Sequence, residues 1–446
     1  MIASNLIPWI YIRIFLKKIC FLCLVIWIIH IFILENAIRH SHRASEDFND
    51  FQSPPVVAEQ DQLLTLYYHS ISSKHDLPKK FLPYRPIQIN ENQLFEHFFL
   101  QISNEFLYPR SSNLVSDIIL YIVKSKIELA ENIDSGTQLK LRLSFENGSQ
   151  GLLKPMRFTR EQETNPDHFY FTDFERHTSE IAAFHVDRIL DFRRVPPVTG
   201  RRINVSELEY LSEHQLRKTF FVSPANNHCF YGSCDYYCKT EFAVCGKPNM
   251  IEASIAMMLP SHRNSQRQKW KHPYRRSYSK SRKAPWENDP QYCHKRVLNK
   301  SLYSPTYRRI YDVIDLSIFD FIIDNMDRHH YETFADFGNS SFIVHLDQGR
   351  GFGHQSKDEL SILAPLTQCC KVRERTWKQL LMLSTNKFKL SKLLRKSLEK
   401  EELAPVLAEP HYAAVDRRLE IILKSIKNCV ARLGMKNVFD KYLIKK

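Results

Sequence analysis

Two aspartates follow closely on apolar runs of the sequence. Asp327 lies in the polar stretch 325–332, and a carboxylate in such a loop can accept a proton from an attacking hydroxyl. Asp347 comes 20 residues later (347 − 327 = 20), at the end of a short apolar run and before several glycines. A divalent metal on a triphosphate can sit at such a carboxylate. This order favours phosphoryl transfer, and two structural aspartates that cap turns are the alternative.

A lysine and a glutamate earlier in the chain fit the same chemistry less specifically. Lys154 lies in a predicted strand, and Glu175 follows 21 residues later (175 − 154 = 21). A strand lysine with a downstream carboxylate can hold nucleotide phosphates or a metal, although a solvated surface pair has the same sequence signature. The chain has no GxGxxG loop and no VAIK or HRD motif, so if it is a kinase, it must be an atypical one.

Hydrophobic periodicity predicts the elements that must position these residues. Alternation over 137–145 indicates a strand, and the Asn-Gly pair at 147–148 predicts a hairpin whose return strand covers 150–156. Helical spacing over 179–192 predicts a helix with Thr178 or Ser179 as its N-cap. The same criteria predict a helix over 311–325, a strand over 342–346 and helices from about 376 to 444.

This order of elements predicts an α+β fold in two lobes, because a hairpin and helix come first and a mostly helical part comes last. We expect the folded domain over 96–446, with an N-lobe of about 96–255 and a C-lobe of about 256–446. Residues 39–95 are mixed and polar, which indicates a stem and an approach segment.

The N-terminus carries the signals of a membrane anchor. Residues 19–34 are apolar and follow the pair Lys17–Lys18, and no small-residue cleavage site comes after them. We expect a cytosolic tail and signal anchor within 1–38, with the remaining chain in the lumen; a cleaved signal peptide is the alternative. Four glycosylation sequons agree with lumenal exposure: Asn147, Asn204, Asn299 and Asn339.

The composition excludes wholesale disorder, because 43% of the residues are hydrophobic and 25% are charged. The formal charge of +14 (63 − 49) leaves nucleic acid, an anionic membrane or an acidic ligand as partners, and the lumen disfavours nucleic acid. A basic run with interleaved aromatic residues occupies 263–283. It is typical of a site for an acidic peptide or a phosphorylated or sulfated glycan, with a solvated loop as the alternative.

The eight cysteines outside the anchor indicate disulfides, because their number is even and the lumen is oxidising. Zinc is the alternative for the four cysteines of 229–245, although their spacing contains no CxxC pair. Cys369 and Cys370 are adjacent and cannot easily pair with each other, so each must reach another cysteine.

Several long motifs resemble, in the same order, the secretory-pathway kinases that include the Golgi casein kinase and the glycosaminoglycan xylosylkinase. They are FERHTSEIAAFHVDRILDFRRVPP, SPANNHCFYGSCDYYC, DNMDRHHYETF, HLDQGRGFG and DELSILAPLTQCC. The resemblance extends over about 95–440. It implies a disulfide-stabilised, two-lobed atypical kinase fold that transfers phosphate from ATP in the Golgi lumen, with Mn²⁺ favoured and Mg²⁺ as the other metal.

The same motifs imply roles for individual residues. By this resemblance Asp327 is the catalytic base, Asp347 replaces the metal-binding aspartate of the usual kinases, Lys154 holds the phosphates, and Glu175 holds metal or the lysine. The implied nucleotide contacts are Gln138, Lys154, Ala256, Met257, Met258, Leu259, Glu332 and Asp347. The implied disulfides are Cys229–Cys245, Cys234–Cys238, Cys293–Cys369 and Cys370–Cys429.

Two positions distinguish this chain within the resemblance. Gln348 follows Asp347 where the casein kinase type has asparagine, which puts the local fit to the metal in question. Glu175 is present where a related pseudokinase has glutamine, so we expect catalytic competence.

The resemblance implies a secreted or Golgi-lumenal serine/threonine kinase that phosphorylates secreted proteins at acidic Ser-x-Glu sites. A xylosylkinase acting on proteoglycan linkers is the alternative enzyme, and an allosteric pseudokinase partner is the third reading. The expected partners are acidic secreted proteins, a homologous kinase or pseudokinase, and the membrane through a type II anchor, with release and secretion as a further expectation.

Overall fold

The structure is a computed structural model that describes residues 93–440 apart from 166–167 and 261–265. These residues belong to one compact unit, Tyr68–Lys446. The predicted anchor and most of the predicted stem lie outside the described residues. Among the residues that are described, no helix is both long enough and apolar enough to cross a bilayer.

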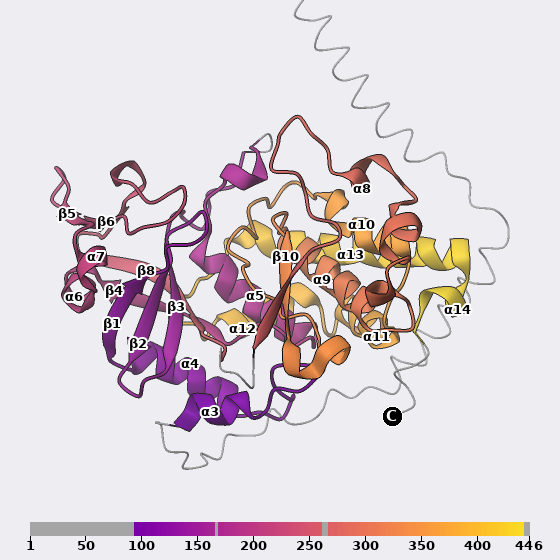
Figure 1. The fold of residues 1–446 in the computed structure, drawn as a ribbon, viewed down its shortest axis with the longest axis horizontal. Helices are drawn as coiled ribbons and strands as arrows, with labels where there is room; N and C mark the ends of the chain where they lie inside the picture. Colours follow the sequence, from indigo (N-terminus) through magenta and orange to yellow (C-terminus); the bar gives the residue numbers. More distant parts are fainter. Residues whose placement is uncertain (1–92, 166–167, 261–265, 441–446) are drawn as a thin grey trace, which may run out of the picture. The chain divides into compact units, whose positions relative to one another are not determined.

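A five-stranded antiparallel sheet carries Lys154 (Figure 1). Its spatial order is β1-β2-β3-β8-β4, with the bounds β1 Ile127–Asn132, β2 Leu141–Phe145, β3 Gln150–Pro155, β8 Met250–Met257 and β4 Val198–Asn204. The ring of Tyr121 on α4 (Leu114–Lys124) packs against Phe145. Helix α5 (His177–Ile189) packs on β4 and β8 and also contacts α9 and α12. The sheet therefore meets the helical part through α5.

The helical part surrounds α9 (Arg309–Ile323), all of whose residues are buried. Helix α9 packs against α10 Ala364–Cys369 and α13 Glu409–Leu433, and α13 in turn contacts α11 Glu374–Leu383, α12 Leu390–Leu398 and α14 Met435–Val438. A two-stranded ribbon joins β9 Arg267–Lys271 to β10 His330–Phe334. The remaining elements are α3 Leu94–Phe99, α6 Val205–Leu211, α7 His214–Arg217, α8 Pro285–Asn288, and the small sheet of β5 Phe220–Val222, β6 His228–Phe230 and β7 Val244–Cys245.

The predicted hairpin is confirmed, since β2 pairs with β3 in antiparallel register across the Asn-Gly turn. The predicted N-cap of α5 is wrong: the helix begins at His177, its cap Arg176 makes no side-chain capping bond, and Ser179 is buried and donates to the carbonyl of Gln348 instead. Tertiary contact with a distant loop therefore takes over the hydroxyl that the sequence assigned to a local cap.

The predicted strand over 342–346 is also wrong. Only Val344 pairs, in a single bridge to Glu332, while the amide of His345 donates to the carbonyl of Arg194. This apolar run is buried without a continuous strand neighbour, and a short buried run has the same sequence pattern as a strand.

Candidate active site

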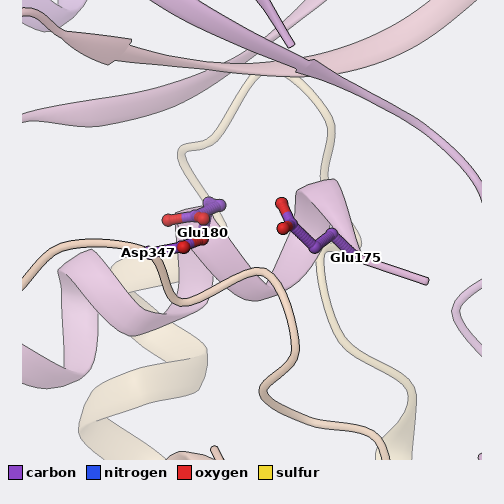
Figure 2. Close-up of side chains that lie close together, drawn as sticks. All are labelled: Glu175, Glu180 and Asp347. Carbon is purple, nitrogen blue, oxygen red and sulfur yellow. The ribbon is translucent and has the colours of Figure 1, made fainter. Parts of the chain in front are cut away.

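Lys154 lies at the centre of three carboxylates, which Figure 2 shows around one point. Its Nζ is 2.8 Å from Glu175 Oε2, 2.5 Å from Glu180 Oε1 and 2.6 Å from Asp347 Oδ1. One carboxylate oxygen from each acid lies within 4.8 Å of the others. We call these three acids the carboxylate cluster.

Four separate segments deliver these groups. Lys154 points from β3, Glu180 from the first turn of α5, and Glu175 from the loop before that helix. Asp347 has φ of 62°, a left-handed conformation that is uncommon outside glycine and that recurs at functional sites. The loop after it approaches Glu175 so closely that a Cβ at Gly349 would lie 2.7 Å from the Cβ of Glu175. Glycine is required there.

The charges of the cluster perturb one another. Burial alone would lower the pKa of Lys154, but Asp347, Glu175 and Glu180 together raise it well above its ordinary value. Burial raises the pKa of Glu175, whereas the ammonium of Lys154 holds the pKa of Asp347 below its usual range. Fully ionised, three acids and one lysine carry a net charge of −2. Oxygen ligands with excess negative charge suit Mn²⁺ or Mg²⁺, so these residues fit a divalent metal.

Asp327 follows α9 in a loop that is tied to the cluster. Its amide donates to Asn325 Oδ1 at 3.0 Å, and Asn325 Nδ2 donates to the carbonyl of Asp347 at 3.3 Å. The Arg350 guanidinium donates to Asp327 Oδ2. His329 Nδ1 lies 2.7 Å from the carbonyl oxygen of Asp327 and 3.3 Å from its Oδ1. The two predicted aspartates are thus held in one connected network.

Gln348 points away from the carboxylate cluster. Its side chain is buried, and its Oε1 accepts a bond of 2.6 Å from Arg328, which also binds Asp320 at 2.8 and 2.9 Å. Its backbone amide donates to Glu180 Oε1 at 3.0 Å. The side chain of Gln348, one methylene longer than asparagine, therefore reaches Arg328. Its amide does not point into the carboxylate cluster.

The predicted nucleotide contacts are distributed over several elements. In the β3–β8 register Lys154 pairs with Ser254 and Leu152 with Ala256, so Ala256 shares the sheet face of Lys154 and the buried Met257 points to the other. Met258 and Leu259 follow β8. The remaining two predicted nucleotide contacts are engaged with other residues. The buried Gln138 donates to the carbonyl of Asp173, and Glu332 on β10 binds Arg267.

A tripeptide with the letters of the common kinase metal motif lies elsewhere. Asp336-Phe337-Gly338 forms part of a 3₁₀ segment after β10, and its aspartate is exposed and does not belong to the carboxylate cluster. Position in the fold, and not the three letters, decides which aspartate can bind a metal.

A strongly basic cavity of about 530 Å³ is lined by His329, the neighbour of Asp327, but not by Asp327 itself. His329 links it to the aspartate, and the cationic or titratable side chains that line it include Arg275, Arg276, Arg282, Lys283, His329 and His330. Arg276 is already engaged, because it donates to Ser361 Oγ at 2.6 Å and stacks on Trp286. Arg275, Arg282 and Lys283 are exposed.

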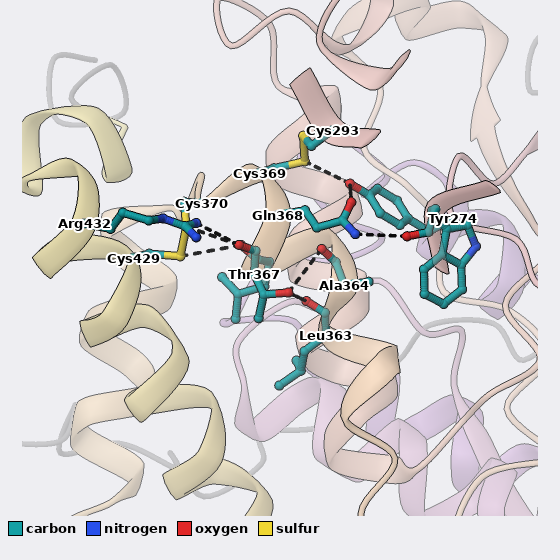
Figure 3. The surroundings of a disulfide bond; sticks show 12 residues. Tyr274, Cys293, Leu363, Ala364, Thr367, Gln368, Cys369, Cys370, Cys429 and Arg432 are labelled. Carbon is teal, nitrogen blue, oxygen red and sulfur yellow. Dashed lines mark hydrogen bonds between the residues drawn. A yellow bond between two sulfur atoms is a disulfide. The ribbon is translucent and has the colours of Figure 1, made fainter. Parts of the chain in front are cut away.

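All four predicted disulfides are present: Cys229–Cys245, Cys234–Cys238, Cys293–Cys369 and Cys370–Cys429. Figure 3 shows how the adjacent Cys369 and Cys370 reach opposite sides of α10, one toward Cys293 and the other toward Cys429 on α13. The left-handed conformation of Cys370 ends α10 and redirects the second thiol.

The sequence reasoning missed Glu180 and Arg350. Glu180 precedes the apolar run Ile181–Phe184 of a predicted helix, and an acid that the fold buries there requires a partner. Arg350 stands between two glycines of a loop, and nothing in that pattern identifies its partners.

The fold and site define a class of protein. A buried lysine among three carboxylates that could hold a metal, connected to a loop aspartate, is the arrangement of a kinase-like phosphotransferase. The chain belongs to the Fam20C family, described as Golgi casein kinase, C-terminal, Fam20, whose model matches residues 93–438.

Known relatives agree with this assignment. The chain is 51% identical over 345 residues to the human extracellular serine/threonine protein kinase FAM20C, covering 77% of this chain and 59% of that protein. It is 41% identical to the mouse pseudokinase FAM20A, covering 87% of this chain and 77% of that protein. The crystal structure of the Golgi casein kinase with Mn/ADP bound matches with a TM-score of 0.77 at 37% identity, covering 87% of this chain and 93% of that one.

Proposed function

We propose that this chain is an ATP-dependent serine/threonine protein kinase of the secretory pathway that phosphorylates secreted proteins at acidic Ser-x-Glu sites. One observation carries the proposal: Lys154 and the carboxylate cluster are joined to Asp327 through Asn325. The sheet residues of 96–255 form the N-lobe in this proposal, and 256–446 form the C-lobe.

Each residue has a defined task in this mechanism. Asp327 orients the acceptor hydroxyl and takes its proton, while Lys154 holds the phosphates of ATP. Glu175, Glu180 and Asp347 would hold Mn²⁺, with Mg²⁺ as the other candidate, and the metal would neutralise charge on the phosphates. Gln138, Glu332 and residues 256–259 would contact the rest of the nucleotide.

The acidic specificity is supported by the basic cavity that His329 lines. Its exposed cations Arg275, Arg282 and Lys283 can attract a carboxylate of the acceptor peptide. The double reversal Arg275→Glu with Arg282→Glu should raise KM for a Ser-x-Glu peptide at least fivefold, about 1 kcal/mol, and leave KM for ATP unchanged. The matched control is Lys280→Glu, because Lys280 lies in the same basic run but does not line the cavity.

The defining experiment offers two acceptors to the purified full chain with ATP and Mn²⁺. We expect phosphate transfer to a Ser-x-Glu peptide, and loss of transfer in both Asp327→Ala and Asp347→Ala. Transfer only to a xylose-containing linker tetrasaccharide would instead identify a xylosylkinase. Nucleotide binding without transfer to either acceptor would identify a pseudokinase partner, contrary to the competence that Glu175 implies.

The cellular setting completes the proposal. The chain would lie in the Golgi lumen behind a type II anchor, with release and secretion, and would meet acidic secreted proteins and a homologous kinase or pseudokinase there. Among the sequon asparagines, Asn204, Asn299 and Asn339 are exposed and Asn147 is half-buried, so all four side chains have some solvent contact for glycosylation.

A further inference from the structure

Arg350 binds the proposed catalytic base Asp327 and also two other segments of the chain. Its Nη1 donates to Asp327 Oδ2, its Nε donates to the carbonyl of Asp173 at 3.2 Å, and its Nη2 donates to the carbonyl of Phe171 at 2.9 Å. The same Nη2 approaches Thr137 Oγ1 at 3.2 Å, and the guanidinium lies 5.5 Å from the Phe171 ring. The side chain is only 6% exposed.

The backbone on both sides of Arg350 is fixed as well. The carbonyl of Gly349 accepts a bond of 2.6 Å from the amide of Arg176, and the amide of Gly351 donates to Gln348. A Cβ at Gly351 would lie 2.6 Å from Ser179 Oγ and 2.9 Å from the carbonyl of Ile323. Arg350 therefore starts from a tightly packed loop, and all three nitrogens of its planar guanidinium donate hydrogen bonds, which fixes the orientation of the side chain.

The two oxygens of the Asp327 carboxylate are held differently. Asp327 Oδ2 is bound by Arg350, whereas Oδ1 is buried and accepts no hydrogen bond from the described residues. The His329 Nδ1 that lies 3.3 Å from Oδ1 is closer to the carbonyl of Asp327, at 2.7 Å, and one N–H serves one acceptor well. Because Oδ1 is shielded from solvent and has no closer donor, the bond from Arg350 to Oδ2 is the main constraint on the orientation of this carboxylate.

We propose that Arg350 is the positioning residue of this active site: it binds one oxygen of Asp327 and so fixes the orientation of the carboxylate that takes the proton of the acceptor hydroxyl. Its remaining donors hold segments 137 and 171–173, which precede α5, while Asp327 follows α9. Arg350 thereby couples the base to the part of the chain that carries Lys154 and Glu175. This inference rests on the proposed kinase function.

Other arginines near the site do not have this geometry. Arg328 binds Asp320, Gln348 and the carbonyl of Leu346, so it stabilises the loop without a hydrogen bond to the Asp327 side chain. Arg160 offers a matched control, because it also donates to one carboxylate, Glu252, and to two carbonyls from a distant segment. Arg160 is half-buried, and its loss measures the general effect of removing an arginine with this set of contacts.

The test compares Arg350→Met, Arg350→Lys and Arg160→Met in the full chain, with KM for ATP, kcat with a Ser-x-Glu peptide and the melting temperature measured for each. A misplaced base costs about 10²-fold in rate, so we expect Arg350→Met to lower kcat by that factor with KM for ATP little changed. Arg350→Lys should regain only part of kcat, because lysine restores the charge but not the fork. Arg160→Met should match Arg350→Met in melting temperature but not in kcat.

A second comparison separates action through Asp327 from an independent role. Arg350→Met is measured in the wild-type and the Asp327→Asn backgrounds by single-turnover transfer. Residues that act as one unit are strongly non-additive, so the substitution should have little further effect once the base is removed. An equal fold-loss in both backgrounds would overturn the proposal, and so would a wild-type kcat in Arg350→Met or Arg350→Lys. A wild-type chain that transfers no phosphate would overturn the kinase function and this inference together.

Discussion

Replacing Lys154 by methionine tests whether the cluster is a single electrostatic unit. Methionine keeps a flexible side chain of similar length but removes the cation that three acids share. In the folded chain the acids would then repel one another without compensation, and the desolvation of Glu175 and Glu180 would remain. We expect a less stable protein that no longer transfers phosphate.

The size of the effect follows from burial. Breaking a buried ion pair costs about 3–5 kcal/mol, and the low end applies because the side chain of Asp347 is 59% exposed and solvent screens its share. With about 2.1 cal/mol/K of unfolding entropy per residue over roughly 350 residues, 3 kcal/mol corresponds to a fall of about 4 °C in melting temperature.

The assay is thermal unfolding of the full chain with EDTA and with Mn²⁺, alongside the exposed-lysine control Lys126→Met. Metal at about 100 times its Kd adds about 2.7 kcal/mol, and the cluster of Lys154→Met has a more negative net charge to receive it. We therefore expect the variant to gain more from Mn²⁺ than the wild type. The reasoning would be refuted if Lys154→Met had the melting temperature of the wild type in EDTA. It would also be refuted if Mn²⁺ raised the melting temperature of the variant less than that of the wild type.

Three further predictions follow from other parts of the structure. Glu180→Gln should weaken Mn²⁺ binding by roughly 10–100-fold in a direct titration, because Glu180 is one of the three proposed ligands and also holds Lys154 and the loop of Asp347. Burial lowers the pKa of His272 to about 3, so between about pH 3 and 6.5 the unfolded chain binds one more proton than the folded chain. The wild-type free energy of unfolding therefore falls by about 1.4 kcal/mol for each unit of decreasing pH in this range. His272→Asn should remove this part of the pH dependence. Serine replacement of Cys370–Cys429, which are 59 residues apart, should cost about 4 kcal/mol in urea unfolding, against about 2 kcal/mol for Cys234–Cys238, which are 4 apart.

A different result would contradict each of these three predictions. Unchanged metal affinity in Glu180→Gln would remove that acid from the site. The same slope of stability with pH in wild type and His272→Asn, with the exposed His214→Asn as control, would show that His272 does not titrate on unfolding. Equal costs for the two cysteine pairs would contradict the loop-entropy argument.

Local pattern was sufficient for the elements that depend on near neighbours in sequence. The β2–β3 hairpin followed from alternation and an Asn-Gly turn, and the helix over α5 followed from its spacing. The strand over 342–346 failed because burial on all sides has no distinctive period. The N-cap of α5 failed because Ser179 found a partner 169 residues away.

The sequence by itself determined the candidate chemistry of this protein: it singled out Asp327, Asp347, Lys154 and Glu175 by residue type and order, and eight cysteines by their even number. Only the tertiary structure decided that Glu180 joins the cluster, that Gln348 does not, and that Arg350 binds the base. The physical reason is range. A strand or turn is specified by residues a few positions apart, whereas the ion pairs of Lys154 with Asp347 and of Arg350 with Asp327 exist only where the folded chain brings distant segments within hydrogen-bond distance.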